Sequence, residues 1–357
     1  MPKYKIAVIR GDGIGPEVIE EGLKILDYFS KNSNVDFSFT ELSWGSDYFF
    51  KNGFMMPENA IAQLLDFDSI YLGAVGHPDL QDHITLNGLL LPIRRQFDQY
   101  VCERPSVLYK GINSPLKGYK AGEIDFVVIR ENTEGEYANI GGFQYFGDPN
   151  EIGIQTSLFT KRGCERVMNY AFELARKRND KKFVTSITKS NAQGYGMVVW
   201  DRAFDNIAKN YPDIKTESLL VDAACMDFIR KPETFDVVVA SNLFGDILTD
   251  IGAIITGSMG LAPSGNIDPS RNFPSMFEPV HGSAPDIVDQ GVANPLAAIF
   301  SAAMMLDHLG ESNFSKMIKN AVEQLIIDAN VLTKDLGGTS TTSKVGNSVV
   351  DNIKDLY

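Results

Sequence analysis

Cysteine, basic residues and long apolar runs are all scarce in this chain of 357 residues. The three cysteines, Cys102, Cys164 and Cys225, match no zinc-binding spacing and cannot all pair with one another, which favours a reducing compartment. The longest nearly apolar run, Leu296–Leu306, is about half the roughly 20 residues that a bilayer-spanning helix needs. The N-terminus shows no basic-then-apolar leader, so we expect a cytoplasmic protein with no membrane contact.

Positive charge is also in deficit. Lys and Arg number 33 against 46 Asp and Glu, and the net charge of −13 would repel a phosphate backbone, so nucleic acid is not an expected partner. Apolar residues make up 44% and charged residues 22%, which are ordinary values for a globular protein. The length predicts about two domains.

Short β-branched runs recur along the chain with amphipathic, helix-like stretches between them. They are Lys5–Ile9, Ser69–Leu72, Asp125–Ile129, Phe183–Thr188, Ser218–Val221 and Phe235–Ala240. Several are apolar throughout, as strands covered on both faces tend to be. This pattern predicts an α/β fold with a mainly parallel sheet.

The first motif, Gly11–Gly15 with the sequence GDGIG, directly follows the first predicted strand. Its glycine spacing differs from the Gly-x-Gly-x-x-Gly of a dinucleotide-binding loop. We therefore interpret it as a structural turn between a strand and a helix, while a nucleotide-binding role is the alternative.

Two acidic residues follow the strand Phe235–Ala240. If this segment is helical, Asp246 and Asp250 stand one turn apart on the same face, where their charges repel unless a cation intervenes. A hard divalent ion such as Mg²⁺ or Mn²⁺ prefers such oxygen ligands. The alternative is a pair of solvated surface aspartates.

Several arginines suggest an acidic ligand. Arg94 and Arg95 lie in an apolar stretch, Arg104 precedes a proline, and Arg130 ends a strongly apolar strand. A guanidinium matches a carboxylate with two hydrogen bonds, so convergent arginines point to a di- or tricarboxylate. Any one of them taken singly is better explained as a surface or ion-pair arginine.

Polar residues also gather where predicted strands end. Arg130, Lys189, Asp222 and Asp246 each lie just beyond the carboxyl end of a strand, where ligands bind in open α/β sheets. Lys189 is a candidate base, and Tyr137 a candidate acid. Each of these residues also has a purely structural interpretation.

The last motif is a stiff loop of prolines, glycines and small residues, Glu278–Ile287, followed by Gly291–Pro295. Its exposed backbone donors suit a nucleotide, but a structural connector has the same composition.

Taken together, these motifs resemble those of the β-decarboxylating dehydrogenases of the isocitrate and isopropylmalate type, over almost the whole chain. The segments that carry the resemblance are GDGIG at Gly11–Gly15, the pair Arg94 and Arg104, RENTEGEY at Arg130–Tyr137, TKSN at Thr188–Asn191, SNLFGDILTD ending at Asp250, and EPVHGSAPDI at Glu278–Ile287. The resemblance implies a fold distinct from the Rossmann type. Residues 1–99 and 253–357 would form a cofactor-side domain, and residues 100–252 a substrate and dimerisation domain.

The resemblance also assigns roles to the matched positions. Substrate contacts are expected from Arg94, Arg104, Arg130 and Leu90. The acid/base pair would be Tyr137 and Lys189. A divalent Mg²⁺ or Mn²⁺ would be held by Asp222, Asp246 and Asp250, and a monovalent cation such as K⁺ is a further expected ion. The cofactor would be bound by Glu278, His281, Gly282, Ser283, Ala284, Asp286 and Asn294. Relatives place the active site between the domains and take the residues matching Lys189 and Asp222 from a neighbouring subunit, which implies a homodimer.

Cofactor and substrate preferences follow from the same positions. A carboxylate at Asp286 accepts hydrogen bonds from a ribose 2′-hydroxyl but repels a 2′-phosphate, which favours NAD over NADP. Gly88 and Leu90 offer no partner for the extra carboxylate of isocitrate. The strings DHITL, FDQY and RENTEGEY look closest to those of tartrate and D-malate dehydrogenases, so oxidative decarboxylation of D-malate or tartrate is the expected activity. The alternatives are 3-isopropylmalate, with Leu90 and Leu91 lining an apolar pocket, and a catalytically silent regulatory subunit.

Overall fold

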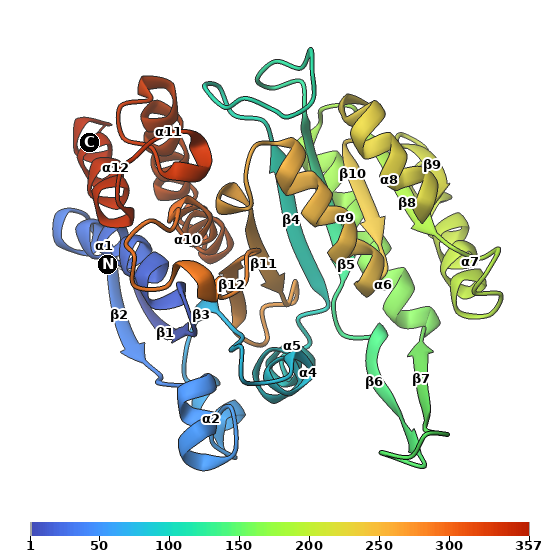
Figure 1. Ribbon diagram of the computed structural model, residues 1–357. Coiled ribbons are helices and arrows are strands. Elements are labelled where there is room, and N and C mark those ends of the chain that lie inside the picture. Colours follow the sequence, from blue (N-terminus) through green and yellow to red (C-terminus); the bar gives the residue numbers. More distant parts are fainter. Residues whose placement is uncertain (1, 357) are drawn as a thin grey trace. The chain divides into compact units, whose positions relative to one another are not determined.

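The two terminal segments of the chain fold together in the computed structural model, which describes residues 2–356 (Figure 1). Unit 1 comprises the residues up to Gln99, Arg104–Ile124 and the residues from Gly252 onward. Unit 2 comprises Tyr100–Glu103 and Asp125–Ile251. The largest difference from the expected division is that residues 104–124 belong to unit 1. The Ser114 hydroxyl, for example, donates to the carbonyl of Ile255 at 2.6 Å.

The strands of unit 1 are β1 (Lys3–Gly11), β2 (Asp36–Glu41), β3 (Ser69–Ala74), β11 (Pro263–Ile267) and β12 (Ser275–Pro279). Its helices are α1 (Gly15–Asn32), α2 (Ser46–Asn52), α3 (Ala60–Leu64), α4 (Asp82–Thr85), α5 (Leu91–Gln96), α10 (Leu296–Leu309), α11 (Ser312–Asp328) and α12 (Thr342–Leu356), and the π-helical turn Leu86–Leu90 joins α4 to α5. The strand order is β2-β1-β3-β12-β11, and only the β11–β12 pair is antiparallel.

Strand β3 and helix α10 form the centre of unit 1. Every residue of β3 is buried, as its mainly apolar sequence predicts for a strand covered on both faces. Helix α10 is buried almost all round, so the apolar run Leu296–Leu306 is a core helix. The buried Tyr71 hydroxyl of β3 donates to the carbonyl of Ala298 at 2.7 Å and ties strand to helix.

The strands of unit 2 are β5 (Asp125–Glu131), β6 (Gly135–Gln144), β7 (Ile152–Leu158), β8 (Phe183–Thr188), β9 (Lys215–Leu220) and β10 (Val237–Ala240). Its helices are α6 (Lys161–Arg178), α7 (Gly196–Ala208) and α8 (Val221–Arg230). Strand β4 (Val101–Val107) and helix α9 (Asn242–Ile255) each run from unit 2 into unit 1. The parallel order β5-β10-β8-β9 confirms the predicted mainly parallel α/β class.

Strands β6 and β7 form a separate antiparallel hairpin.

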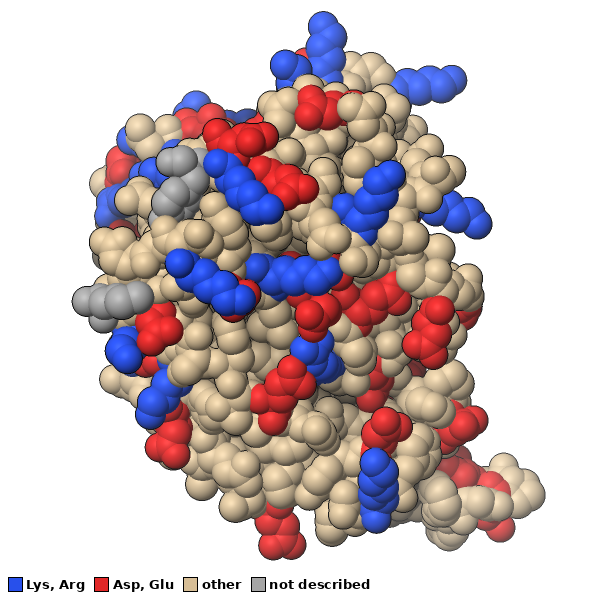
Figure 2. All heavy atoms as spheres, turned by 90° about the vertical axis from the view of Figure 1, so that its left-hand side faces the viewer, with Lys and Arg blue, Asp and Glu red and all other residues tan. Residues whose placement is uncertain are grey.

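On the face shown in Figure 2, basic and acidic side chains are interspersed, so this face carries no single basic patch. No helix among residues 2–356 has both the length and the apolar character needed to cross a membrane.

Candidate functional site

In unit 2, Arg130 lies at the end of β5 next to the start of α9. Ala240 of β10 pairs with Arg130, and α9 begins two residues later, which brings Asn242 beside the arginine. The buried guanidinium donates from Nε and Nη2 to the Asn242 Oδ1 at 3.0 and 2.7 Å. Its Nη1 pairs with Asp246 Oδ1. Since a Cβ on Gly245 would lie 2.7 Å from the Arg130 Cβ, only glycine lets α9 approach β5 so closely.

Tyr137 completes this cluster. Its hydroxyl donates to Asp246 Oδ2 at 2.9 Å, and the Arg130 Cζ lies 5.3 Å from its ring centroid. Asp246 therefore accepts a hydrogen bond on each carboxylate oxygen, although its side chain is 34% exposed. Asp250 lies one helical turn after Asp246 on α9, as the spacing predicts. Its side chain is exposed.

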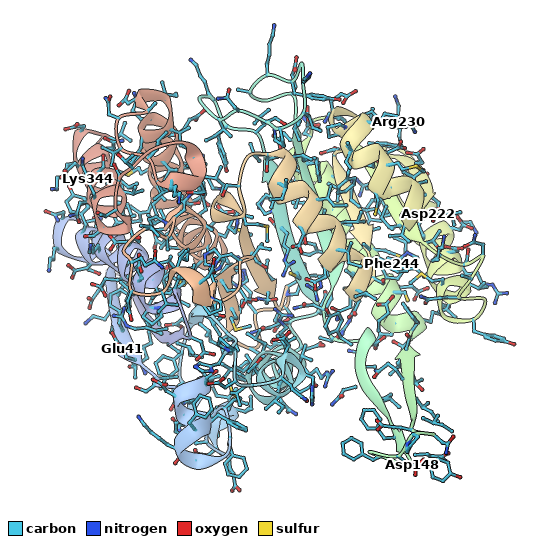
Figure 3. All side chains as sticks on the ribbon, in the orientation of Figure 1. Glu41, Asp148, Asp222, Arg230, Phe244 and Lys344 are labelled. Carbon is cyan, nitrogen blue, oxygen red and sulfur yellow. The ribbon has the colours of Figure 1, made fainter. Side chains whose placement is uncertain are left out.

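Lys189 and Asp222 form a second pair in unit 2. They follow the parallel strands β8 and β9, in which Thr188 pairs with Leu220. The Lys189 ammonium donates to Asp222 Oδ1 at 2.5 Å, and this hydrogen bond holds the pKa of the Asp222 carboxyl below its usual value. Figure 3 shows Asp222 on α8. The four polar residues expected at the strand ends therefore form two pairs, Arg130 with Asp246 and Lys189 with Asp222.

The acidic residues fit a divalent cation only in part within one chain. Asp246 and Asp250 present carboxylate oxygens from one helix, the donor type that Mg²⁺ and Mn²⁺ prefer. Among residues 2–356, however, no three His, Cys, Asp or Glu side chains lie close enough together to hold a metal ion. Asp222 thus does not join the other two in a single-chain cluster, and its supply by a neighbouring subunit stays a prediction.

In unit 1, Arg94 and Arg104 are seated on the β11–β12 pair. Arg94 Nη2 donates to Glu278 Oε1 at 2.7 Å, and Arg104 Nε donates to the Ser264 hydroxyl at 3.3 Å. Ser264 and Glu278 are partners in the antiparallel ladder, so the ladder brings the two buried arginines together. The Arg94 Nε is buried and has no hydrogen-bond partner among the described residues. Because an unsatisfied buried donor is unfavourable, this N–H fits an acidic ligand.

Two residues of the π-helical turn Leu86–Leu90, which precedes α5, have different surroundings. Leu90 packs in the core of unit 1 with Trp44 and Met55. Asn87 donates from Nδ2 to the His83 carbonyl at 2.8 Å, whereas its Oδ1 is buried with no described partner. A π-turn inside a helix is frequent at functional sites, and here it presents a polar acceptor.

The proposed cofactor loop contains another buried atom that lacks a partner. His281 Nδ1 lies 3.0 Å from the Gly282 carbonyl, while Nε2 is buried without a partner among the described residues. Burial lowers the pKa of His281, so its ring is held neutral. A neutral imidazole nitrogen that lacks a partner fits the hydrogen-bonding edge of a nucleotide base.

The other cofactor positions are held by their own contacts. Ser283 accepts at its carbonyl from the Ile14 N–H, and Asp286 is exposed in the 3₁₀ turn Pro285–Ile287. Asn294 donates to Asp335 at 2.9 Å and accepts from the Leu296 N–H. Glu278 is different, because its Oε1 takes hydrogen bonds from Arg94 and from Asn266 Nδ2, 2.7 Å in each case. The described side-chain hydrogen bonds of Glu278 therefore connect it to the proposed substrate-binding residue Arg94.

Three residues that orient the arginines were not assigned by the sequence analysis: Asn242, Ser264 and Asn266. Asn242 comes two residues after the end of the buried strand β10, and that position near a strand end is a signal which the sequence did contain. Ser264 and Asn266 lie in a strand of mixed small and polar residues, and no pattern marks them.

A model of the isocitrate/isopropylmalate dehydrogenase family matches residues 5–349, and the chain belongs to that family. It is 49% identical over 355 residues to a probable tartrate dehydrogenase/decarboxylase of Agrobacterium vitis, covering 99% of this chain and 98% of that protein. It is 48% identical over 356 residues to the D-malate dehydrogenase (decarboxylating) of Escherichia coli (strain K12), covering 98% of each. The solved structure of isocitrate dehydrogenase from Methylococcus capsulatus is 32% identical, has a TM-score of 0.88 and covers 98% of this chain and 99% of that one. The resemblance and the fold class inferred from the sequence are confirmed.

Proposed function

We propose that this protein catalyses the metal- and NAD-dependent oxidative decarboxylation of D-malate or tartrate. The observation that carries the proposal is the cluster in which Arg130 and Tyr137 both contact the Asp246 carboxylate. This cluster brings together a guanidinium that can bind a carboxylate, a phenol that can donate a proton, and a carboxylate of the kind that binds Mg²⁺ or Mn²⁺. The names of the full-length relatives support the same reaction class.

Arginines bind the diacid in this proposal. Arg94, Arg104 and Arg130 contact the substrate carboxylates through charge-assisted hydrogen bonds, which are about twice as strong as neutral ones. The buried Arg94 Nε, which has no partner in the described part of the chain, is available as a donor for one of them. Asn87 Oδ1 is a polar acceptor for a hydroxyl on the substrate's third carbon.

The proton steps fall to Lys189 and Tyr137. As the neutral amine, the neighbouring subunit's counterpart of Lys189 accepts the proton from the substrate hydroxyl as hydride leaves, and the Asp222 of that same subunit, which contacts Lys189 within one chain, keeps it oriented. Tyr137 returns a proton to carbon after CO₂ departs. A divalent cation at Asp246, Asp250 and the neighbouring subunit's counterpart of Asp222 supplies Lewis-acid chemistry when bound.

The cofactor binds at the segment from His281 to Asn294. The Asp286 carboxylate accepts from the ribose 2′-hydroxyl of NAD and repels the 2′-phosphate of NADP. His281 Nε2, buried and without a described partner, contacts the base.

A homodimer is the proposed assembly, because unit 2 exposes large apolar side chains on two of its elements. The β6–β7 hairpin, whose tip carries Asp148 in Figure 3, exposes Phe143, Tyr145 and Phe146 at 66%, 66% and 79%. Helix α8 exposes Met226. Clusters of exposed apolar side chains, such as the one on the hairpin, mark protein interfaces.

The two alternatives are less well supported. For 3-isopropylmalate, Leu90 would line an apolar substrate pocket, but Leu90 packs in the core of unit 1. A regulatory, inactive subunit would be expected to have lost Lys189 or a metal-binding aspartate, and this chain retains all of them.

A substrate panel tests the proposal. D-malate, meso- and L-tartrate, 3-isopropylmalate and isocitrate are each supplied with Mn²⁺ and either NAD or NADP, and reduced cofactor and CO₂ are measured. We expect turnover of D-malate or a tartrate with NAD. Comparable turnover of isocitrate with NADP would overturn the substrate and cofactor assignments, and no reduced cofactor with any diacid would favour the inactive subunit.

A further inference from the structure

The GDGIG motif forms the turn between β1 and α1 in unit 1, and this part of the sequence interpretation is borne out by geometry. Gly13 has φ = 58°, a left-handed conformation that favours glycine. A Cβ at this position would lie 2.0 Å from the carbonyl oxygen of Ser283. The turn is therefore packed directly against the proposed cofactor loop.

Asp12, the acidic residue of the motif, joins three segments that are distant in sequence. Its Oδ1 accepts from the Ser46 N–H at 2.7 Å, and its Oδ2 accepts from the Ser46 hydroxyl at 2.7 Å and from the Gly76 N–H at 2.8 Å. Its own N–H donates to the Ala74 carbonyl at 2.8 Å. The residue is 8% exposed, so its charge is balanced by these donors and not by water.

Residues next to Asp12 and its partner Gly76 connect this hydrogen-bonded cluster to the proposed cofactor loop. The Ile14 N–H donates to the Ser283 carbonyl at 2.9 Å. Gly76, which Asp12 binds, lies against the Ser283 side chain, because a Cβ there would stand 3.3 Å from the Ser283 Oγ. Ser283 is therefore held from two sides by groups that Asp12 fixes in place.

We propose, on the basis of the NAD-dependent function above, that Asp12 is a positioning residue for the cofactor. Its carboxylate locks the turn after β1 and the loop after β3 so that both support the segment His281–Asp286. It acts through Ser283 and does not touch the cofactor.

Asp12→Asn is the sharpest perturbation, because the amide has the shape of the carboxylate but only one acceptor oxygen. An NH₂ group in place of Oδ1 faces the Ser46 N–H, and one in place of Oδ2 faces the Gly76 N–H. Either orientation breaks at least one backbone hydrogen bond. Ser46→Ala is a milder variant that removes only the hydroxyl bond, and it keeps the test open if Asp12→Asn folds poorly.

The first readout is hydrogen exchange of the ligand-free protein over residues 281–291. We expect exchange about tenfold faster in Asp12→Asn, the equivalent of one lost hydrogen bond, and a smaller change in Ser46→Ala. The matched control is Asp47→Asn, an exposed acidic residue next to Ser46. Unchanged exchange in both Asp12→Asn and Ser46→Ala, or an equal increase in the control Asp47→Asn, would overturn the proposal.

The second readout is the Kd of NAD by calorimetry, together with the KM values. We expect the Kd and KM for NAD to rise about tenfold in Asp12→Asn while the KM for the diacid stays the same. A loss of folded protein alone would lower kcat and leave both KM values unchanged, which would refute the positioning role. If the wild-type protein does not bind NAD, the proposed function fails. The exchange measurement still tests whether Asp12 holds the segment His281–Asp286 in place.

Discussion

Arg94→Lys tests whether the buried guanidinium recognises a substrate carboxylate. The substitution keeps a positive charge that reaches Glu278, whose Oε1 lies 2.7 Å from Arg94 Nη2. It removes Nε, the buried donor that has no partner among the described residues. The variant thus separates the ion pair from the donor available to a ligand.

The magnitude follows from the type of bond that is lost. A hydrogen bond to a charged group contributes about 1.5–3 kcal/mol, and about 1.36 kcal/mol corresponds to a tenfold change. We therefore expect the KM for D-malate or tartrate to rise about 10- to 150-fold. Since the ammonium retains the pairing with Glu278, the free energy of unfolding should change by no more than about 1 kcal/mol.

The assay is steady-state kinetics at saturating NAD, with urea unfolding measured on the same preparations. Arg95→Lys is the matched control, because it makes the same chemical change one residue along α5. In Arg94→Ala the Glu278 carboxylate loses the charged one of its described partners and keeps the Asn266 amide, so this variant should lose about 3–5 kcal/mol of stability. A KM for the diacid within about threefold of wild type in Arg94→Lys would refute the reasoning, since that change corresponds to about 0.65 kcal/mol, less than half the minimum of about 1.5 kcal/mol for a hydrogen bond to a charged group.

Three further outcomes are expected. Asp246→Asn should weaken Mn²⁺ binding by more than the roughly 10–100-fold typical of losing an outer-shell partner, with an unchanged circular dichroism spectrum; metal dependence like that of wild type would exclude the aspartate as a ligand. Burial and the nearby Arg271 lower the pKa of His308 from its ordinary value of 6.5 to about 4. The unfolded chain therefore binds this proton first, and the stability that neutral His308 contributes, complete above about pH 6.5, is lost as the pH falls toward 4. Urea unfolding at pH 7.5 and pH 4 should show His308→Gln losing about 3 kcal/mol less than wild type, and equal losses would contradict the assignment. Phe146→Asp should convert the proposed dimer to monomer in sedimentation velocity, whereas Asp148→Asn should not; a Phe146→Asp dimer would remove the hairpin from the interface.

The sequence predicted the strands whose character is set by local composition. The apolar runs Lys5–Ile9 and Asp125–Ile129 lie within β1 and β5, because a strand covered on both faces needs apolar residues at every position. Strands β11 and β12 were not predicted. The residues Pro263–Ile267 have low strand propensity, and their pairing partners lie in Ser275–Pro279, beyond a connecting loop.

The same distinction applies to the site. Placing Asp246 and Asp250 one turn apart required only a helical period. The contact of Arg94 with Glu278 joins residues 184 positions apart, and such a contact depends on which strands become neighbours. Local spacing placed Asp246 and Asp250 on one helix, whereas tertiary pairing decided which side chains contact Arg94.

The placement of β12 beside β3 has a consequence for how the protein emerges from the ribosome. The Ser69 hydroxyl of β3 donates to the carbonyl of Ser275, 206 residues later, at 3.0 Å. At the roughly 5–20 residues per second of translation, this edge of β3 waits about 10–40 s for its partner strand. The continuous segment Asp125–Ile251 has by then left the exit tunnel and is free to fold. The nascent N-terminal strands therefore present an unpaired, apolar edge during synthesis, a natural binding point for a chaperone.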